Sequence, residues 1–136
     1  PTDLKVSVEE DDYASYLNWL APSDATITFP QTVFIRYTLQ EPGVADNAAA
    51  GYRRWFLARL KLLEATLEDR EYLCSGRFTI ADICVSYALY LARSLGIDEA
   101  FKPNILRWTD MLFEREAFKK IEAYKYDGPG PAGPND

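Results

Sequence analysis

A short segment at residues 78–83 contains a complete set of signals for the start of a helix. Thr79 suits the N-cap position and Asp82 the third helical position, so each side chain can accept a hydrogen bond from the other residue's backbone N–H. Phe78 and Ile83 flank the pair at the two positions that commonly pack together across a helix start. Such an N-cap contributes about 1 kcal/mol. Asp82 can also be considered as a buried general base, but its spacing from Thr79 favours the structural role.

The residues that follow this helix start are apolar at helical spacing. The stripe comprises Ile80, Ile83, Cys84, Tyr87, Ala88, Leu91 and Leu95. It is broader than the apolar stripe of a surface helix. We therefore expect the capped helix to run through the middle of a bundle, to bury this stripe and to end at Gly96.

The rest of the chain also carries helical signals. An acidic run at residues 9–12 precedes a long first helix, which we expect to bend near Pro22 and to continue toward Gly43. A more regular helix is predicted over 46–69, and shorter ones follow from Pro103. No segment has the alternating pattern of a convincing strand. The sequence therefore predicts an all-α fold.

Composition and charge argue against several classes of function. The net charge is -6 and the basic residues are scattered, which disfavours binding to nucleic acid. No apolar run approaches the roughly 20 residues that span a bilayer. The sequence has no histidine, which removes Ser-His-Asp and Cys-His catalysis and most His-ligated metal sites. The four carboxylates at 9–12 point around a helix, so they predict a solvated helix start and no metal site.

Domain organisation and redox state follow from simple features. At 136 residues the chain suits one domain, and we divide it into a linker remnant at 1–7, a helical domain at 8–125 and a Pro/Gly-rich tail at 126–136. Because the first residue is not methionine, we expect an upstream portion in the parent protein. Cys74 and Cys84 are read as reduced thiols, which fits a cytoplasmic location.

Several motifs together resemble the C-terminal domain of the glutathione S-transferase family. They are Gly76-Arg-Phe-Thr-Ile-Ala-Asp-Ile83 preceded by Leu73-Cys, then Pro103-Asn-Ile-x-x-Trp108, and finally Arg115-x-Ala-Phe118. A capping box alone is common, but this combination in this order is specific, and the likeness covers nearly the whole chain. One departure is Glu116, where the family usually has proline, and it concerns only the break before the last helix.

The resemblance implies a bundle of about five to six helices that docks in the parent protein against an N-terminal thioredoxin-like domain. In the family that domain binds most of the glutathione, the co-substrate, and carries the Tyr, Ser or Cys that activates its thiol. The resemblance therefore assigns no catalytic residue to this chain and implies no metal. By itself the chain is expected to be inactive, and the capping box of Thr79 and Asp82 is expected to be structural.

By the same resemblance, the first helix forms a wall of the pocket for a small hydrophobic electrophile and much of the contact in a homodimer. Asn18 aligns with a first-helix asparagine that reaches glutathione in similar bacterial proteins. Trp19 and Phe29 would supply apolar walls, and Asp24 or Thr26 a polar contact. An equally weighted alternative places Trp19 and Phe29 in the core.

Two functions of different classes stay open from the sequence. The first is the substrate-binding and dimerising half of a glutathione transferase with a role in detoxification. The second is a non-catalytic protein-interaction module of the same fold. A helical ligand-binding regulator is weaker, because no basic DNA-reading segment is visible. Without a partner domain, apolar surface along the first and capped helices should be exposed, so the chain should self-associate through that face.

Overall fold

A continuous helical rod forms the first part of the fold in the computed structural model, which describes residues 3–123. Along the chain the rod comprises α1 (Tyr13–Pro22), the π-helical η1 (Ser23–Thr28), α2 (Phe29–Ile35) and the π-helical η2 (Arg36–Gln40). Pro22 lacks an N–H, and the hydroxyl groups of Ser23 and Thr26 donate to the carbonyl oxygens of Leu20 and Pro22 at 2.6 and 2.9 Å. Both features favour wider turns over regular α-helix at this point. The predicted long first helix is present and becomes irregular at Pro22.

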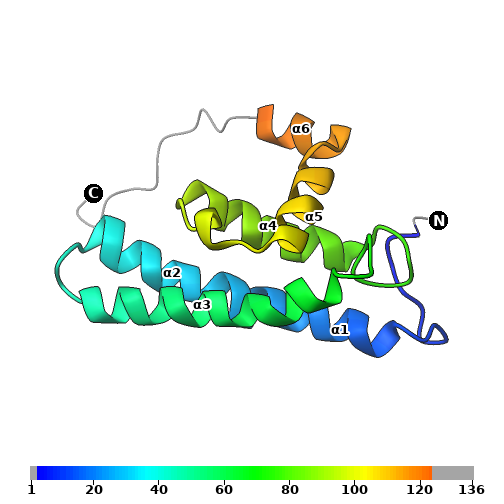
Figure 1. The fold of residues 1–136 in the computed structure, drawn as a ribbon, viewed down its shortest axis with the longest axis horizontal. Coiled ribbons are helices and arrows are strands. Elements are labelled where there is room, and N and C mark those ends of the chain that lie inside the picture. The colour runs from blue at the N-terminus through cyan, green and yellow to red at the C-terminus, as the bar shows by residue number, and fades with distance from the viewer. Residues whose placement is uncertain (1–2, 124–136) are drawn as a thin grey trace, which may run out of the picture.

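The second long helix, α3 (Asp46–Thr66), runs back along the first rod. The two are joined by a turn at Gly43, whose φ of +83° suits glycine and whose N–H donates to Asp46 Oδ1 at 3.1 Å. The buried side chains of α3 are those of Ala49, Phe56, Leu60 and Leu63. Figure 1 shows α1, α2 and α3 as one layer that supports the remaining helices.

The capped helix, α4 (Ile80–Ser94), packs on this layer between α1 and α5. Its position in the middle of the bundle agrees with the prediction, but the face that it buries does not. The buried positions are Ala81, Asp82, Val85, Ser86, Ala88, Leu89 and Ala92. Of the predicted stripe only Ala88 is fully buried, whereas Ile80, Ile83 and Tyr87 are exposed. Small residues let the helices approach closely, so the alanine face of α4 turns inward and the larger apolar face turns out.

The last two helices complete the bundle above α4 (Figure 1). They are α5 (Pro103–Phe113), after a short 3-10 turn η3 (Asp98–Ala100), and α6 (Glu116–Ala123). Glu64 of α3 caps α5, because its carboxylate oxygens accept the N–H groups of Asn104 and Ile105 at 3.2 and 3.0 Å. The helix break before Glu116 is present although the family's usual proline is missing. Residues 3–123 contain no strand, and the predicted all-α fold is confirmed.

The segment before α1 packs against the rest of the fold. Within the predicted linker remnant, Val6 is fully buried and Leu4 bonds to the start of α4. The predicted tail at 126–136 lies outside the described residues, so the domain boundaries stay a prediction. Across 3–123, no helix combines the length and apolar character that a bilayer crossing requires.

Candidate functional site

The five residues expected to bind substrate lie along the first helical rod, spread over several turns. Asn18 and Asp24 are exposed, and Trp19 is only 6% exposed and belongs to the core. The Thr26 hydroxyl is used by the helix itself, through its bond to the Pro22 carbonyl. The Phe29 side chain is 48% exposed, and its ring meets the Tyr52 ring edge-on at 6.1 Å. Positions 18 and 29 are separated by 11 residues of helix, about 16 Å.

A polar hollow of about 320 Å³ lies between α1 and the end of α3. We define it by its lining, which is Ser15, Asn18, Trp19, Leu62, Ala65, Thr66, Asp69, Arg70 and Leu73. Asn18 and Trp19 come together here, whereas Asp24, Thr26 and Phe29 are not in the lining. The hydroxyl, amide and guanidinium groups of Ser15, Asn18 and Arg70 are suited to hydrogen bonding with a polar or anionic ligand.

A larger apolar groove of about 580 Å³ lies between α4, α5 and α6. Its lining is Phe78, Ile83, Ser86, Tyr87, Tyr90, Leu112, Arg115, Ala117, Phe118, Ile121 and Glu122. The Arg115 guanidinium lies over the Phe78 ring, 3.7 Å from its centre. Sequence reasoning missed this groove. The only available signal was the apolar spacing of Ile83 and Tyr87, which we had assigned to the core.

Stacked aromatic rings connect the helices around the apolar groove. Phe113 and Phe118 stack with ring centres 4.4 Å apart, and Tyr90 meets both rings edge-on, at 5.8 and 5.3 Å. These contacts join α4, α5 and α6. The stacked rings therefore tie the three helices together beside the groove.

The capping box is a structural feature and does not reach either cavity with a reactive group. Asp82 is fully buried, and its Oδ2 accepts bonds from the N–H and the hydroxyl of Thr79 at 2.8 and 3.0 Å. Its Oδ1 accepts the Leu73 N–H at 2.9 Å. Burial raises the pKa of Asp82, and these hydrogen bonds oppose that rise. Phe78 and Ile83, the flanking residues, both line the apolar groove.

Neither thiol is activated. Burial raises the pKa of Cys74 to about 11, and burial also raises the pKa of Cys84. Both therefore stay protonated at neutral pH. Among residues 3–123, no three His, Cys, Asp or Glu side chains gather closely enough to hold a metal ion.

Comparison with known families gives one match. The model of the glutathione S-transferase C-terminal domain matches residues 40–116. No curated protein sequence matches the chain.

Several solved structures with a similar fold are glutathione transferases. URE2P6 from Phanerochaete chrysosporium, in complex with oxidized glutathione, has a TM-score of 0.77 and 23% identity over 88% of this chain. Ure2p5 from the same organism, cocrystallized with 1-(S-glutathionyl)-2,4-dinitrobenzene, has a TM-score of 0.75 and 23% identity over 93% of this chain. Glutathione S-transferase III in apo form has a TM-score of 0.74 and 21% identity over 96%. The chain spans 56%, 63% and 62% of these three proteins.

Proposed function

Because this chain belongs to the glutathione S-transferase C-terminal domain family, we propose that it is the helical half of a glutathione transferase that joins glutathione to small hydrophobic electrophiles. The thiol-activating group lies in an upstream thioredoxin-like domain of the parent protein. Two properties of the helical half support this division. Both of its thiols have raised pKa values, and its buried Asp82 is fully used in hydrogen bonds. This half supplies proximity and a dry wall, and it is inactive alone.

The observation that carries the proposal is the exposed apolar surface of α4. Ile80, Ile83 and Tyr87 are exposed on a helix whose opposite face forms the core, and Tyr87 is 61% exposed. Ile83 and Tyr87 continue into the apolar groove. Large exposed apolar patches usually mark interaction sites. We assign this surface, which we call the α4 face, to the upstream thioredoxin-like domain.

The substrate residues are proposed from their exposure on the first rod. Phe29, half-exposed beside Tyr52, gives an apolar wall for the electrophile. Asp24 gives a polar contact, or Thr26 does so as an acceptor, because its hydroxyl hydrogen is donated to the Pro22 carbonyl. Trp19 is almost fully buried, so it can only support the wall from behind. Asn18 is exposed and lines the polar hollow with Ser15 and Arg70, so its amide group is accessible to glutathione.

A homodimer is proposed through the opposite side of the molecule, where α1 and α3 are exposed. Leu17 of α1 and Leu62 of α3 are both about half-exposed, and Leu62 borders the polar hollow. Contact between two copies at this side would place Asn18 near the interface. A cytoplasmic location fits two thiols that stay reduced.

The experiment compares this chain with a longer protein that includes its upstream sequence. Glutathione and 1-chloro-2,4-dinitrobenzene are the substrates, because their product is the molecule bound in one structure of this fold. We expect conjugation by the longer protein and none above the buffer rate by the chain alone. Turnover by the chain alone would contradict the division of labour. A longer protein that is folded but inactive would point instead to a non-catalytic interaction module.

A further inference from the structure

The chain before α1 is fastened to the start of α4. We call residues 3–12 the N-terminal strap. Val6 of the strap is fully buried, and the Leu4 carbonyl oxygen accepts the Ile80 N–H at 2.9 Å. Ile80 is the first residue of α4, where backbone N–H groups have no partner within the helix. The strap therefore completes the cap of α4 from outside the helix.

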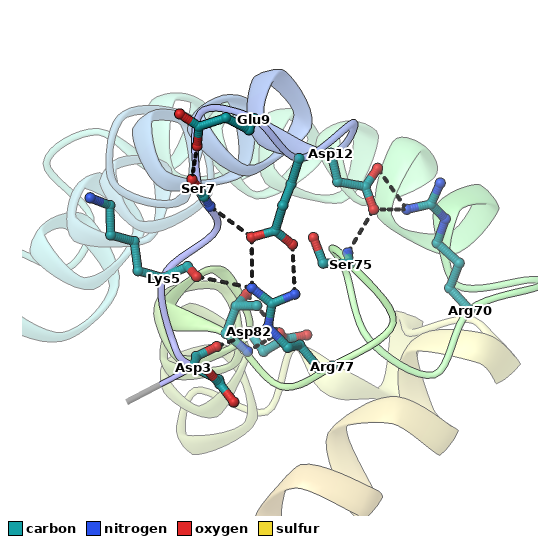
Figure 2. A network of polar contacts seen from close by, with 11 residues as sticks. Asp3, Lys5, Ser7, Glu9, Asp12, Arg70, Ser75, Arg77 and Asp82 are labelled. Carbon is teal, nitrogen blue, oxygen red and sulfur yellow. Dashed lines mark hydrogen bonds and ion pairs between the residues drawn. The ribbon is translucent and has the colours of Figure 1, made fainter. Parts of the chain in front are cut away.

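Arg77 supplies most of the side-chain bonds between the loop before α4 and the strap (Figure 2). Its Nη1 and Nη2 lie 2.7 and 2.9 Å from the two carboxylate oxygens of Glu10. Its Nε donates to the carbonyl oxygen of Asp3 at 3.0 Å, and Nη2 donates also to that of Lys5 at 3.0 Å. One guanidinium thus holds three strap residues with all of its nitrogens. A lysine, which lacks the planar fork, cannot reproduce this set.

Asp12 forms a second anchor at the other end of the strap. Its carboxylate accepts the Ser75 N–H at 2.6 Å and lies 3.2 Å from Nη1 of Arg70 (Figure 2). Ser75 has a φ of +53°, a left-handed conformation that is uncommon outside glycine. The bond from Asp12 holds this turn in place. The acidic run at 9–12, which we expected to be a solvated helix start, therefore contains two residues, Glu10 and Asp12, that bond to the loop before α4.

We infer that Arg77 is a positioning residue that sets the direction in which the chain before residue 3 meets the helical domain. The inference rests on the proposed function, because that direction places the upstream domain against the α4 face. Asp3 and Lys5 lie at the end of the strap that is nearest in sequence to the upstream domain, and Arg77 holds the carbonyl groups of both. Without Arg77 this end of the strap keeps the Leu4–Ile80 hydrogen bond and the buried Val6 but loses its side-chain bonds to the loop before α4. The strap is then looser, so the effective concentration of the upstream domain at α4 falls.

If Arg77 only stabilised the fold, its replacement would act mainly on the melting temperature. The side chains of Arg77 and Glu10 are 34% and 32% exposed, and ion pairs at such exposure add little to stability. We therefore expect Arg77→Gln to shift the melting temperature by less than about 4 °C. Arg53 provides a matched control, because its side chain is 33% exposed and it pairs with Glu99 at 3.2 Å, away from the strap.

Amide hydrogen exchange on this chain tests the attachment directly. The Ile80 N–H reports the strap through Leu4, and the Ile83 N–H, bonded to the Thr79 carbonyl at 3.3 Å, reports α4 itself. We expect Arg77→Gln to speed exchange at Ile80 by about tenfold and to leave Ile83 unchanged. Arg53→Gln should change neither. Equal acceleration at both amides, or none at Ile80, would overturn the inference.

A reversed ion pair separates the carbonyl bonds from the charge. The double variant E10R/R77E restores opposite charges, but a glutamate at position 77 has no donors for the carbonyl groups of Asp3 and Lys5. Exchange at Ile80 should therefore stay about tenfold faster than in the wild type. Recovery of wild-type exchange would show that the charge pair alone holds the strap, and the inference would fail.

The functional arm uses the longer protein with its upstream sequence. We expect Arg77→Gln to lower kcat/KM for conjugation by about tenfold, with Arg53→Gln equal to the wild type. A wild-type longer protein that conjugates, together with an Arg77→Gln variant of the same kcat/KM, would refute the positioning role. A longer wild-type protein without conjugation would refute the proposed function. In that case the exchange result at Ile80 alone decides whether Arg77 directs the strap.

Discussion

At the scale of single residues, Asp82 carries a fully buried carboxylate, whose two oxygens accept three hydrogen bonds. We predict that Asp82→Asn lowers the free energy of unfolding by about 2 kcal/mol. The reason is that an amide presents an NH₂ group to at least one of the donors at Leu73 and Thr79, which leaves a buried donor without an acceptor. Urea unfolding measures the loss. Thr79→Ser, which keeps the hydroxyl, is the control, and an unchanged midpoint for Asp82→Asn would contradict the prediction.

Glu10 gives the chain a dependence on acidic pH. Its bonds to Arg77 lower its pKa from 4.5 to about 2. Because the pKa is lower in the folded state, the pair stabilises the fold above pH 4.5, and this contribution is lost as the pH falls toward about 2. We expect the wild type to exceed Glu10→Gln in urea midpoint at neutral pH, and the difference to shrink below pH 4.5 and in added salt. A difference that is constant with pH would contradict the assignment.

At the scale of elements, the presence of each helix and its first residue could be predicted better than the face that the helix buries. The capping box marked the start of α4 correctly because its signals lie within six residues, 78–83. The buried face of α4 was wrong because hydrophobicity ranks Ile80, Ile83 and Tyr87 above alanine, whereas close helix packing selects the alanines. Nothing local in the sequence distinguishes an apolar face that packs against the core from one that stays exposed on this chain.

The orientation of α4 can be tested by two neighbouring substitutions. Gln31 of α2 donates from Nε2 to the Ala88 carbonyl at 2.9 Å, so α2 and α4 are close at this point. Ala88→Leu should therefore overpack the core and lower the free energy of unfolding by about 1–3 kcal/mol. Tyr87→Ser, one residue earlier but exposed, should change it by less than about 0.5 kcal/mol. Chemical denaturation measures both losses. A loss for Tyr87→Ser as large as that for Ala88→Leu would show that Tyr87 is buried, as the stripe predicted from the sequence requires.

The candidate cavities were harder to predict than the helices because each combines elements that are distant in sequence. The apolar groove joins Tyr87 of α4 to Leu112 of α5 and Phe118 of α6. Each of these residues alone has the pattern of a core position. Of the residues carried over from the family, Asn18 and Trp19 line a shared cavity. In the proposed function the substrate site also depends on an upstream domain, whose position this sequence does not specify.

At the scale of the whole molecule, two surfaces on different helices combine exposed apolar side chains with a hollow. One is the α4 face with the apolar groove, and the other includes Leu17, Leu62 and the polar hollow on α1 and α3. The chain spans 56–63% of the length of the glutathione transferases that share its fold, so in proteins of that size further residues are available to cover one surface. A homodimer would then use the other.

Self-association of the isolated chain should reveal which of the two surfaces binds a second copy more strongly. We predict concentration-dependent self-association through the α4 face, because burial of exposed apolar side chains drives association when no partner domain covers them. Light scattering over a concentration series measures it, and the double variant I83S/Y87S should shift the chain toward monomer without unfolding it. Leu62→Ser on α3 is the matched control and should change the mass much less. A wild-type chain that stays monomeric at high concentration would contradict the prediction, and a larger effect of Leu62→Ser would move the association to the side of α1 and α3.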